Sequence, residues 1–345
     1  MDYKPVPTVA IVILNWNGQK FLAQFLPSVI KYSDGCAIYV VDNQSTDNSL
    51  LFLKEHFPEI KLIVHPQNLG FCAGYNEALR QIKVDYYVLL NSDVEVTSGW
   101  VTPVISLMEA QPAIAACQPK IKSYYQPTFF EYAGAGGGLL DRYGYPFCRG
   151  RLFQTLEEDH NQYNDVVPVF WASGACLFVR ATAYQQTDGL ETAFFAHMEE
   201  IDLCWRLQNI GYQVMYCGQS TVFHVGGGTL PATNPRKTFL NFRNGLALLY
   251  KNLGSSNFYL ILMARLLLDW IAALKFLLGG QPADFRAVLK AHWAVWQNRK
   301  YWQQKRAEQK QTKAKNLSGY YKGSIVWDYF VRQKRSYPEL EKNKF

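Results

Sequence analysis

The chain has 345 residues, 49% of them hydrophobic, which suffices for one large domain with a sizeable core and an appendage, or for two modest domains. Its seven cysteines are odd in number and form no CxxC pair, which argues against a disulfide framework and favours buried free thiols in a reducing compartment. The formal net charge is +7.

The first residues do not resemble a secretory signal. Residues 1–5 are polar, and the apolar run that follows them contains Asn15, Trp16 and Asn17. We interpret this run as a buried first strand, and we expect the protein to stay in the cytoplasm.

The first third of the chain alternates short apolar runs with helical patterns. Apolar runs predict strands at residues 9–14, 37–41, 61–64 and 86–90. Helical spacing and capping residues predict helices at residues 18–30, 45–57 and 74–82. Alternation of this kind indicates a parallel α/β sheet with helices on both faces.

The middle of the chain, residues 113–190, is richer in Gly, Tyr and Phe and less regular. The elements predicted from here on are a strand at 166–179, a helix at 199–211 and last strands at 212–217 and 221–225. We find no internal repeat.

The character of the chain changes at about residue 236. Residues 258–278 are strongly apolar, and their charged residues Arg265, Asp269 and Lys275 fall within an arc of about 120° on a helix. This pattern predicts an amphipathic helix with a wide apolar face, and three charges make it a poor membrane span. Residues 299–315 predict a solvated helix or disorder.

The charge changes sign at the same boundary. Residues 1–235 carry 14 Lys and Arg against 22 Asp and Glu, a net −8, whereas residues 236–345 carry 21 against 6, a net +15. An acidic body with a basic tail fits docking on an anionic surface, for which membrane headgroups and nucleic acid both have the right charge. Nucleic acid is the less favoured partner because the chain has no recognised nucleic-acid-binding module.

Two polar clusters follow the second and third predicted strands. Asp42 comes directly after a strand, where a carboxylate can accept hydrogen bonds from a pyrimidine N–H or from ribose hydroxyls. A simple helix cap is the alternative interpretation of this cluster. Residues 68–76 contain Gly70 and other small residues that let the backbone approach a ligand and favour an anion at a helix N-terminus. An ordinary loop-to-helix transition explains them equally well.

Asn91-Ser92-Asp93 ends the fourth predicted strand. An aspartate at this position can supply one oxygen ligand to a hard divalent cation, while diphosphate oxygens supply others. A strand-terminating turn is the alternative. His224 lies at the end of a later strand, before three glycines, where an imidazole can also bind a metal.

Three carboxylates, Glu199, Glu200 and Asp202, open the predicted helix at 199–211. The helix dipole stabilises acids at such a position, which is the plain interpretation. Two phenylalanines precede them, however, and indicate a partly enclosed site. A carboxylate there can have a raised pKa and act as a general base.

The order of these clusters resembles the family 2 glycosyltransferases, and within them the bacterial rhamnosyltransferase-like branch. The resemblance runs from about residue 9 to 253, over the stretches VAIVILNWNG, VVDNQSTDNS, NLGFCAGYN, YYVLLNSDV, FFAHMEEIDLCWR and VFHVGGGT. It implies an α/β fold of the GT-A type, with a mostly parallel central sheet flanked by helices and a C-terminal helical extension. The implied domains are a catalytic domain at 1–235, with a nucleotide-sugar half to about 112 and an acceptor half from 113, and a basic helical region at 236–345.

The resemblance also implies roles for the matching residues. The residues that would bind the nucleotide sugar are Asn15, Asp42, Asn68, Gly70, Asn91 and Asp93. Asp93 and His224 would bind Mg²⁺ or Mn²⁺, and Glu200 would be the catalytic base.

Two departures from the family pattern bear on these roles. Asn91-Ser92-Asp93 holds a single carboxylate, so metal affinity would depend on the diphosphate and His224. A Glu-Glu pair stands where Glu-Asp is commoner, so Glu199 and Asp202 stay alternatives to Glu200 as the base.

The expected activity is an inverting transfer of rhamnose or a hexose from a dTDP- or UDP-linked donor. The expected acceptor is a hydroxyl of a glycan, or of a polyprenyl-diphosphate-linked glycan, in bacterial surface polysaccharide synthesis such as that of O-antigen. Because the metal-binding motif holds a single carboxylate, an alternative stays open: a donor-binding but catalytically silent subunit of a glycosyltransferase complex. The basic C-terminal region either contacts the cytoplasmic face of the inner membrane peripherally or packs on the catalytic domain or a second subunit.

Overall fold

The computed structural model describes residues 6–226, 234–254, 256–309 and 316–345. The helices are α1 (Gln19–Tyr32), α2 (Ser49–His56), α3 (Gly70–Leu79), α4 (Thr102–Ala110), α5 (Ala181–Gln186), α6 (Glu199–Asn209), α7 (Pro235–Asn252), α8 (Phe258–Leu278), α9 (Pro282–Gln297), α10 (Arg299–Gln309) and α11 (Ile325–Phe330). The strands of the large sheet are β1 (Val9–Asn15), β2 (Ala37–Asp42), β3 (Lys61–Val64), β4 (Tyr86–Asn91), β5 (Val94–Val96), β6 (Ile114–Ser123), β11 (Val166–Pro168), β12 (Cys176–Arg180) and β13 (Gln213–His224). Those of a smaller sheet are β7 (Gly138–Asp141), β8 (Pro146–Cys148), β9 (Arg151–Leu152), β10 (Thr155–Leu156) and β14 (Tyr320–Tyr321).

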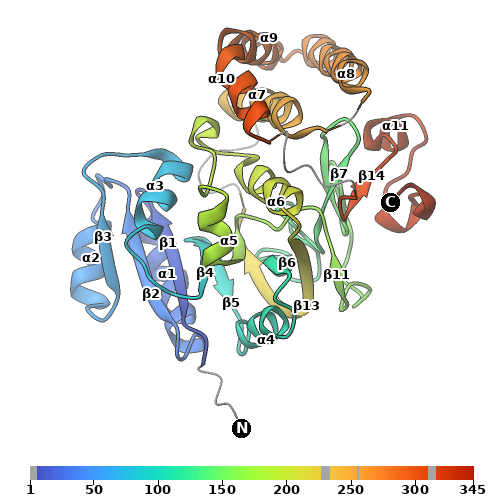
Figure 1. Ribbon diagram of the computed structural model, residues 1–345. Helices are drawn as coiled ribbons and strands as arrows, with labels where there is room; N and C mark the ends of the chain where they lie inside the picture. The colour runs from blue at the N-terminus through green and yellow to red at the C-terminus, as the bar shows by residue number, and fades with distance from the viewer. Residues whose placement is uncertain (1–5, 227–233, 255, 310–315) are drawn as a thin grey trace.

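The large sheet forms the centre of the molecule (Figure 1). Its strand order is β11-β13-β6-β12-β4-β1-β2-β3, and β5 pairs with β13. The first four strands of the chain pair in parallel, as the alternation of strands and helices predicts. Their carboxyl ends therefore lie at one edge of the sheet, which is where ligands bind in open α/β sheets.

The second half makes this sheet mixed rather than mostly parallel. β12 runs antiparallel to both β4 and β6, and β11 runs antiparallel to β13. The predicted strand at 166–179 is divided between β11 and β12. Pro168 closes β11, and a proline cannot donate the next ladder hydrogen bond. Residues 212–225, predicted as two strands, form the one strand β13 with a register shift between Cys217 and Thr221.

Both faces of the sheet are covered, so its strands are apolar on both sides. In β1, Ile11 and Ile13 pack into the core with α1 and α4, whereas Ala10 and Val12 pack on the opposite face with α3 and α6. This two-sided burial explains why the strand is a continuous apolar run rather than an alternating one. All seven cysteines are free and six of them are buried, in agreement with the prediction of unpaired thiols.

The smaller sheet joins the middle of the chain to its end. Its strand order is β10-β9-β8-β7-β14, and β14 pairs in parallel with β7 through Tyr320–Leu140 and Tyr321–Asp141. The end of the chain with α11 consequently lies beside β7 (Figure 1). The C-terminal region is thus helical with one short strand. Of the stretch 299–315, residues 299–309 form α10, and residues 310–315 lie outside the described part of the chain.

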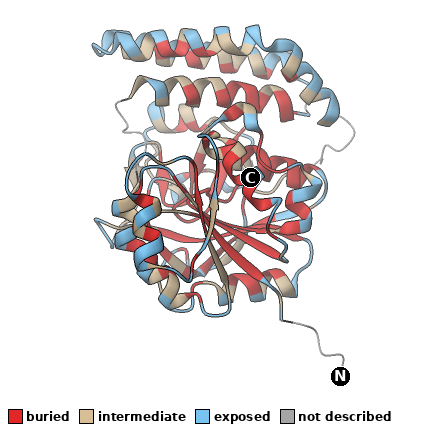
Figure 2. Ribbon diagram, turned by 90° about the vertical axis from the view of Figure 1, so that its left-hand side faces the viewer, coloured by how far each residue is buried: buried red, intermediate tan, exposed pale blue. Residues whose placement is uncertain are grey.

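Helices α7 to α10 form a layer on the side of the large sheet away from the amino terminus (Figure 1). α9 packs against both α7 and α8. The outer helix of this layer has many exposed residues, and the helix beneath it has more buried ones (Figure 2). Within the described residues, every helix is too short or too polar to cross a membrane.

Candidate active site

The carboxyl ends of β1 and β2 bring Asn15 and Asp42 together. They are neighbours in the parallel register, and Asn15 Nδ2 donates hydrogen bonds to Asp42 Oδ1 at 3.2 Å and to Ser45 Oγ at 3.1 Å. The Ser45 N–H donates to the other Asp42 oxygen at 2.9 Å. Both Asn15 and Asp42 are buried, yet Asn15 Oδ1 has no hydrogen-bond donor among the described residues. An acceptor in this position can receive a hydrogen bond from a polar ligand at the sheet edge.

Asn43 connects this edge to the start of α3. Its Nδ2 donates to Asn68 Oδ1 at 3.0 Å and to the Gly70 carbonyl at 3.1 Å, and its Oδ1 accepts from the Leu69 N–H at 2.9 Å. Gly70 has φ of +75°, and a Cβ there would lie 2.6 Å from the ring of Phe195. The close approach that Gly70 permits is therefore to Phe195, a residue of the loop that precedes the acidic pair.

Asp93, His224 and Glu131 form a cluster beyond the end of β4. His224 pairs with Val94 across β13 and β5, which places its ring beside Asp93. His224 Nε2 is 3.2 Å from Asp93 Oδ1, and His224 Nδ1 is 3.0 Å from Glu131 Oε2. All three residues are buried. Burial alone would lower the pKa of His224, but its hydrogen bonds to Asp93 and Glu131 raise that pKa to about 10.

This cluster fits a divalent cation held by two protein ligands. Two ligands at about 2.1 Å from one octahedral ion lie about 3 Å apart, close to the separation of Asp93 Oδ1 and His224 Nε2. A carboxylate on the second ring nitrogen, here Glu131, is the usual partner of a metal-binding histidine. Among the described residues no three His, Cys, Asp or Glu side chains form a complete ligand set. An ion at Asp93 and His224 would therefore take its other ligands from a bound diphosphate and water.

The acidic pair lies at the amino end of α6. Burial raises the pKa of Glu199 well above its usual value, and repulsion from Glu200 adds to this. Burial also raises the pKa of Glu200, to about 7. One oxygen of each carboxylate is buried without a hydrogen-bond donor among the described residues. Glu199 is buried, whereas Glu200 is partly exposed, so Glu200 is the better placed of the two to meet a substrate.

The loop before this pair has an unusual backbone. Phe195, His197 and Met198 have φ of 66°, 69° and 71°, a region that residues other than glycine rarely adopt. Helix α7 holds the loop in place. Asn244 Nδ2 donates to the carbonyls of Phe194 at 3.1 Å, Ala196 at 2.8 Å and His197 at 2.7 Å. Such strain persists only where the surroundings impose it, and it is common at functional sites.

Asp202 has a different environment from the two glutamates. It is fully buried and accepts hydrogen bonds from Arg206 at 2.7 Å, Lys251 at 3.0 Å and Asn252 at 2.7 Å. Burial alone would raise its pKa, but Lys251 and Arg206 lower it to about 2. A carboxylate that is so stabilised in its ionised form, and so enclosed, is a poor proton acceptor. Its geometry favours a structural role.

Backbone contacts bring the donor-side residues and the acidic pair together. The Phe71 N–H donates to the Phe195 carbonyl at 3.2 Å, and the Asn91 N–H donates to the Ala175 carbonyl at 3.0 Å. A Cβ on Gly174 would lie 3.8 Å from Glu200 Cβ and 3.8 Å from the ring of Phe71. Segments that are 84 and 124 residues apart in the chain thus converge at one edge of the sheet.

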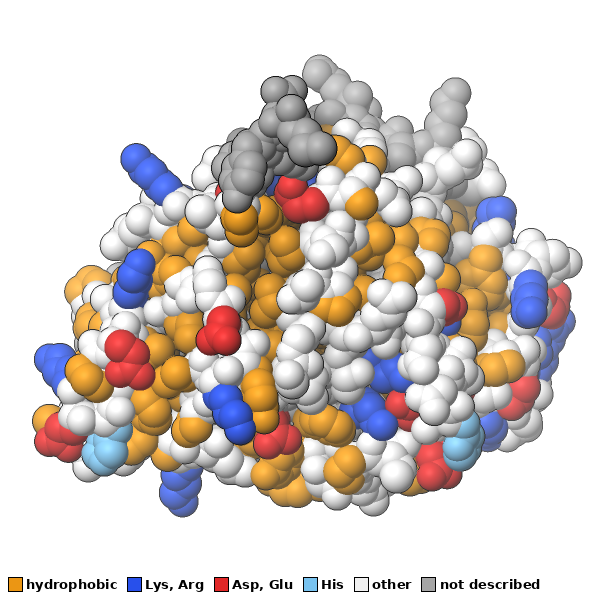
Figure 3. Space-filling model, turned by 90° about the horizontal axis from the view of Figure 1, so that it is seen from below, with side chains coloured by type: hydrophobic (Ala, Val, Ile, Leu, Met, Phe, Trp, Pro, Cys, Tyr) orange, Lys and Arg blue, Asp and Glu red, His pale blue; other side chains and the backbone are white. Residues whose placement is uncertain are grey.

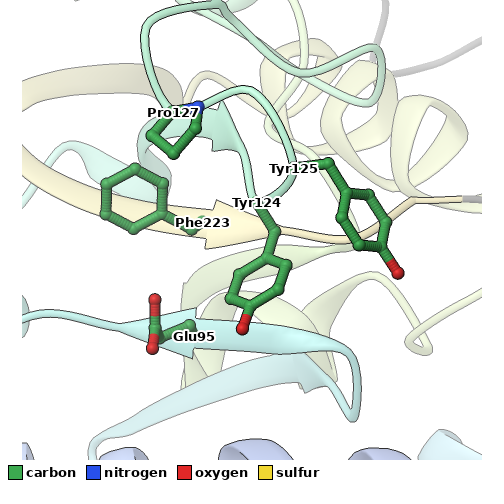
Figure 4. A pocket seen from close by; sticks show the side chains of 5 residues that line it. All are labelled: Glu95, Tyr124, Tyr125, Pro127 and Phe223. Carbon is green, nitrogen blue, oxygen red and sulfur yellow. The ribbon is translucent and has the colours of Figure 1, made fainter.

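An open pocket of about 380 Å³ lies beside the cluster of Asp93, His224 and Glu131 (Figure 4). It is lined by Glu95, Tyr124, Tyr125, Pro127 and Phe223. Glu95 and Phe223 pair across β5 and β13 one step from Val94 and His224. Because neighbouring residues of a strand point to opposite faces, this pocket and the ring of His224 lie on different sides of the two strands.

The structure adds site residues that the sequence analysis did not identify. Glu131 follows an irregular Phe-Phe segment, and nothing in its sequence context indicates a partner for His224. Asn244 lies in the region predicted to be an appendage, so its bonds to the loop at 194–197 could not be expected. The sequence pattern could have identified Asn43, because it directly follows Asp42 in the same polar cluster.

Two proteins similar in sequence to this chain are rhamnosyltransferases. The N-acetylglucosaminyl-diphospho-decaprenol L-rhamnosyltransferase of Mycobacterium tuberculosis is 25% identical over 230 residues, covering 62% of this chain and 75% of the relative. The rhamnosyltransferase WbbL of Escherichia coli is 23% identical over 222 residues, covering 60% of this chain and 80% of the relative.

The fold is also found in solved structures. A mannosyltransferase from Pyrobaculum calidifontis, in complex with GDP-Man and Mn²⁺, superposes with a TM-score of 0.53 at 14% identity, covering 89% of this chain and 88% of that one. This likeness confirms the GT-A fold. Residues 10–174 match the sequence profile described as glycosyl transferase family 2. The chain therefore carries a family 2 glycosyltransferase domain of the GT-A fold, similar to those of bacterial rhamnosyltransferases.

Proposed function

We propose that this protein transfers rhamnose or a hexose, with inversion, from a dTDP- or UDP-linked donor to a hydroxyl group. The proposed acceptor is a glycan or a polyprenyl-diphosphate-linked glycan of bacterial surface polysaccharide synthesis. The observation that carries the proposal is the pair of ligands Asp93 Oδ1 and His224 Nε2, 3.2 Å apart, at the same sheet edge as a glutamate of raised pKa. The relatives named above are rhamnosyltransferases, which supports the choice of sugar.

The donor would lie along the carboxyl ends of β1, β2 and β4. The unpaired Asn15 Oδ1 and the Asp42 carboxylate would accept hydrogen bonds from the nucleobase and ribose. Asp93 and His224 would hold Mg²⁺ or Mn²⁺, which would supply positive charge to neutralise the leaving diphosphate. Glu131 would keep the ring of His224 in the orientation that turns Nε2 toward Asp93.

Glu200 is the proposed base. It would take the proton of the acceptor hydroxyl while that oxygen attacks the anomeric carbon, so that the bond to the diphosphate breaks on the opposite side. A carboxylate with a pKa of about 7 is ionised in a large fraction of molecules at neutral pH and still binds a proton readily. Glu199 would stay protonated beside it, because burial raises its pKa and a second negative charge so close to Glu200 is unfavourable.

Donor turnover by the wild type and by two conservative variants tests this proposal. We expect binding of dTDP or UDP to be strengthened by Mn²⁺, and release of nucleotide diphosphate from the sugar donor to be lost in Asp93→Asn and in Glu200→Gln. Only Asp93→Asn should also weaken the effect of Mn²⁺ on nucleotide binding. A wild type that binds a nucleotide sugar but never releases its diphosphate, with or without acceptor glycans, would instead support a catalytically silent subunit.

A further inference from the structure

Helix α8 has two of its three charged residues on the inside. Arg265 and Asp269 are 3% and 0% exposed and form an ion pair at 2.9 Å. Tyr145 donates to Asp269 at 2.7 Å, and His292 of α9 lies 3.2 Å from its other oxygen. Because the polar residues of α8 are used to bind the rest of the protein, its apolar residues are left to face outward.

The outer face of α8 is almost entirely apolar, and we call it the α8 stripe. Its exposed residues are Tyr259, Leu260, Met263, Leu267, Trp270, Ile271, Leu274, Leu277 and Leu278. At 100° per residue these nine side chains fall within an arc of about 120°, over a length of about 30 Å. Leu260, Leu267 and Leu278 are 70%, 64% and 88% exposed. A continuous apolar surface of this extent that is exposed to solvent indicates a binding surface.

Helix α9, which packs against α8, and the following α10 also carry exposed aromatic and basic side chains. Trp293 and Trp296 of α9 are more than half exposed, and their rings stack at 4.8 Å. The guanidinium of Arg299 lies 4.8 Å from the centre of the Trp296 ring. The exposed basic residues of these helices are Lys275, Arg286, Lys290, Arg299 and Lys300. Tryptophan and basic residues beside a leucine-rich face are typical of the membrane interface.

Acidic side chains are few on these helices. From residue 256 to the end of α10 at Gln309 they are the buried Asp269, the half-buried Asp284, which accepts a hydrogen bond from Thr238 at 2.5 Å, and the exposed Glu308, which pairs with Lys305 at 3.2 Å. The face seen from below in Figure 3, opposite to these helices, carries acidic and basic side chains interspersed. The exposed charge of helices α8 to α10 is thus mostly positive, which complements a negatively charged partner.

We propose that the α8 stripe, with the exposed Trp and basic residues of α9 and α10, docks flat on an anionic lipid bilayer. The leucines would enter the boundary of the acyl chains, Trp293 and Trp296 would lie at headgroup level, and the basic residues would contact lipid phosphates. A second copy of this chain suits the surface less well, because facing copies would bring their basic residues together.

This docking would also place the proposed reaction near the membrane. A cavity of about 390 Å³ lies between α9–α10 and the residues just before the strained loop at 195–198. Its lining includes Thr192, Ala193, Arg243, Asn298 and Tyr301. A lipid-linked acceptor held in the bilayer would thereby approach the loop that leads to Glu200. This last step rests on the proposed function, whereas the docking surface does not.

Vesicle flotation of the full-length protein tests the proposal. We expect wild type to float with vesicles of phosphatidylcholine and phosphatidylglycerol, to float weakly with phosphatidylcholine alone, and to be released by salt. Leu267→Glu/Leu274→Glu should lower binding to the anionic vesicles by at least about tenfold. The reason is that the two replaced leucine side chains would otherwise move from water into the bilayer. The matched control is Leu51→Glu on α2, where the leucine is 57% exposed and far from the stripe; it should bind as wild type does.

Three further readouts make the test decisive. Lys290→Glu/Lys300→Glu, at exposed positions that cannot disturb the core, should weaken binding only to the anionic vesicles. Nucleotide binding by each variant shows that it is folded and is independent of catalysis. Wild type that stays unbound with both kinds of vesicle, or stripe variants that float as well as wild type, would overturn the proposal. Self-association that the stripe variant abolishes, without vesicle binding, would assign the surface to a second copy.

Discussion

His224 is held between Asp93 and Glu131, and a divalent ion would have to replace the proton on Nε2 while Nδ1 keeps its bond to Glu131. In the proposed site the two carboxylates therefore have different tasks although both touch the same ring. Asp93 would bind the ion, and Glu131 would orient the histidine. Removing the charge of Glu131 should thus affect the metal without removing a ligand.

We predict that Glu131→Gln weakens Mn²⁺-dependent binding of a nucleotide diphosphate by about 10- to 100-fold, as is usual for the partner of a metal-binding histidine. Calorimetric titration with Mn²⁺ in the presence of UDP or dTDP measures this. Glu95→Gln on β5 is the matched control, because its side chain lines the pocket on the other side of the strand. Equal Mn²⁺ affinity in both variants would contradict the role given to Glu131.

The pH dependence of turnover should report on Glu200. Since burial raises its pKa to about 7, we expect kcat to rise as pH increases through about 7 and to level off once the carboxylate is ionised. Glu200→Gln should lower kcat by about 10²- to 10⁴-fold and remove this dependence. A kcat that stays constant from about pH 5 to about pH 9 would point to another proton acceptor.

At the scale of single elements, the start of α3 and the loop before α6 are fitted to each other. Gly70 has both a positive φ of +75° and the ring of Phe195 at 2.6 Å from the place of a Cβ. Gly35 has a similar φ of +79° but nothing within 4 Å, so it isolates the backbone contribution.

We therefore predict that Gly35→Ala costs about 1–2 kcal/mol of unfolding free energy, from the left-handed backbone alone. Gly70→Ala should cost about 1–3 kcal/mol more, because the methyl group must displace the ring. Denaturation by urea measures both. Adding Phe195→Ala to Gly70→Ala should recover the additional cost. Equal destabilisation by the two glycine variants would show that the ring moves freely.

Helix α7 acts on the site through Asn244, which holds three carbonyls of the strained loop. We predict that Asn244→Ala lowers kcat by about 10- to 100-fold with little change in donor affinity, because misplacing a base by a fraction of an ångström slows the reaction without weakening nucleotide contacts. The control is Asn241→Ala, at a half-buried position in the same helix. An equal loss of donor affinity and kcat would indicate that the variant disturbs the whole fold.

At the scale of the whole molecule, an ion-pair network joins α6 and the segment before it to the C-terminal helix α7. Lys251 of α7 is 2% exposed and pairs with Glu191 at 2.9 Å and with Asp202 at 3.0 Å. Cutting the chain near residue 236 would remove Lys251 from both carboxylates. Full-length point variants are therefore the right tools for studying the C-terminal region.

We predict that Lys251→Met destabilises the protein by about 3–5 kcal/mol, because the buried Glu191 loses its counter-charge and the buried Asp202 keeps only that of Arg206. Lys300→Met, at an exposed position, should change stability by less than about 0.5 kcal/mol. Asp202 has a pKa lowered to about 2, so its stabilising contribution is fully present above the unfolded value of 3.8 and is lost as pH falls through about 2. Denaturation curves at neutral and acidic pH measure both effects, and a small difference between the two lysine variants would contradict the prediction.

Much of the first half was predictable because its information is local. The apolar runs and helix caps predicted β1 to β4 and α1 to α3, and parallel strands with polar residues at their ends place Asn15 and Asp42 at one edge. The family 2 resemblance and the GT-A fold are confirmed. The roles of Asp93, His224 and Glu200 stay predictions, although the structure brings them to the same edge of the sheet.

What the sequence could not determine depends on contacts between distant segments. Residues 258–278 were correctly predicted as an amphipathic helix, but a periodic pattern does not say which face is turned inward. Arg265 and Asp269 are buried because Tyr145 and His292, 124 and 23 residues from Asp269, provide their partners. The partnership of Glu131 with His224 spans 93 residues. The local periodicity and residue types of the sequence thus determined the helices, the strands and the polar residues at their ends. Tertiary packing alone decided which polar groups form buried pairs and which apolar side chains stay exposed for a partner.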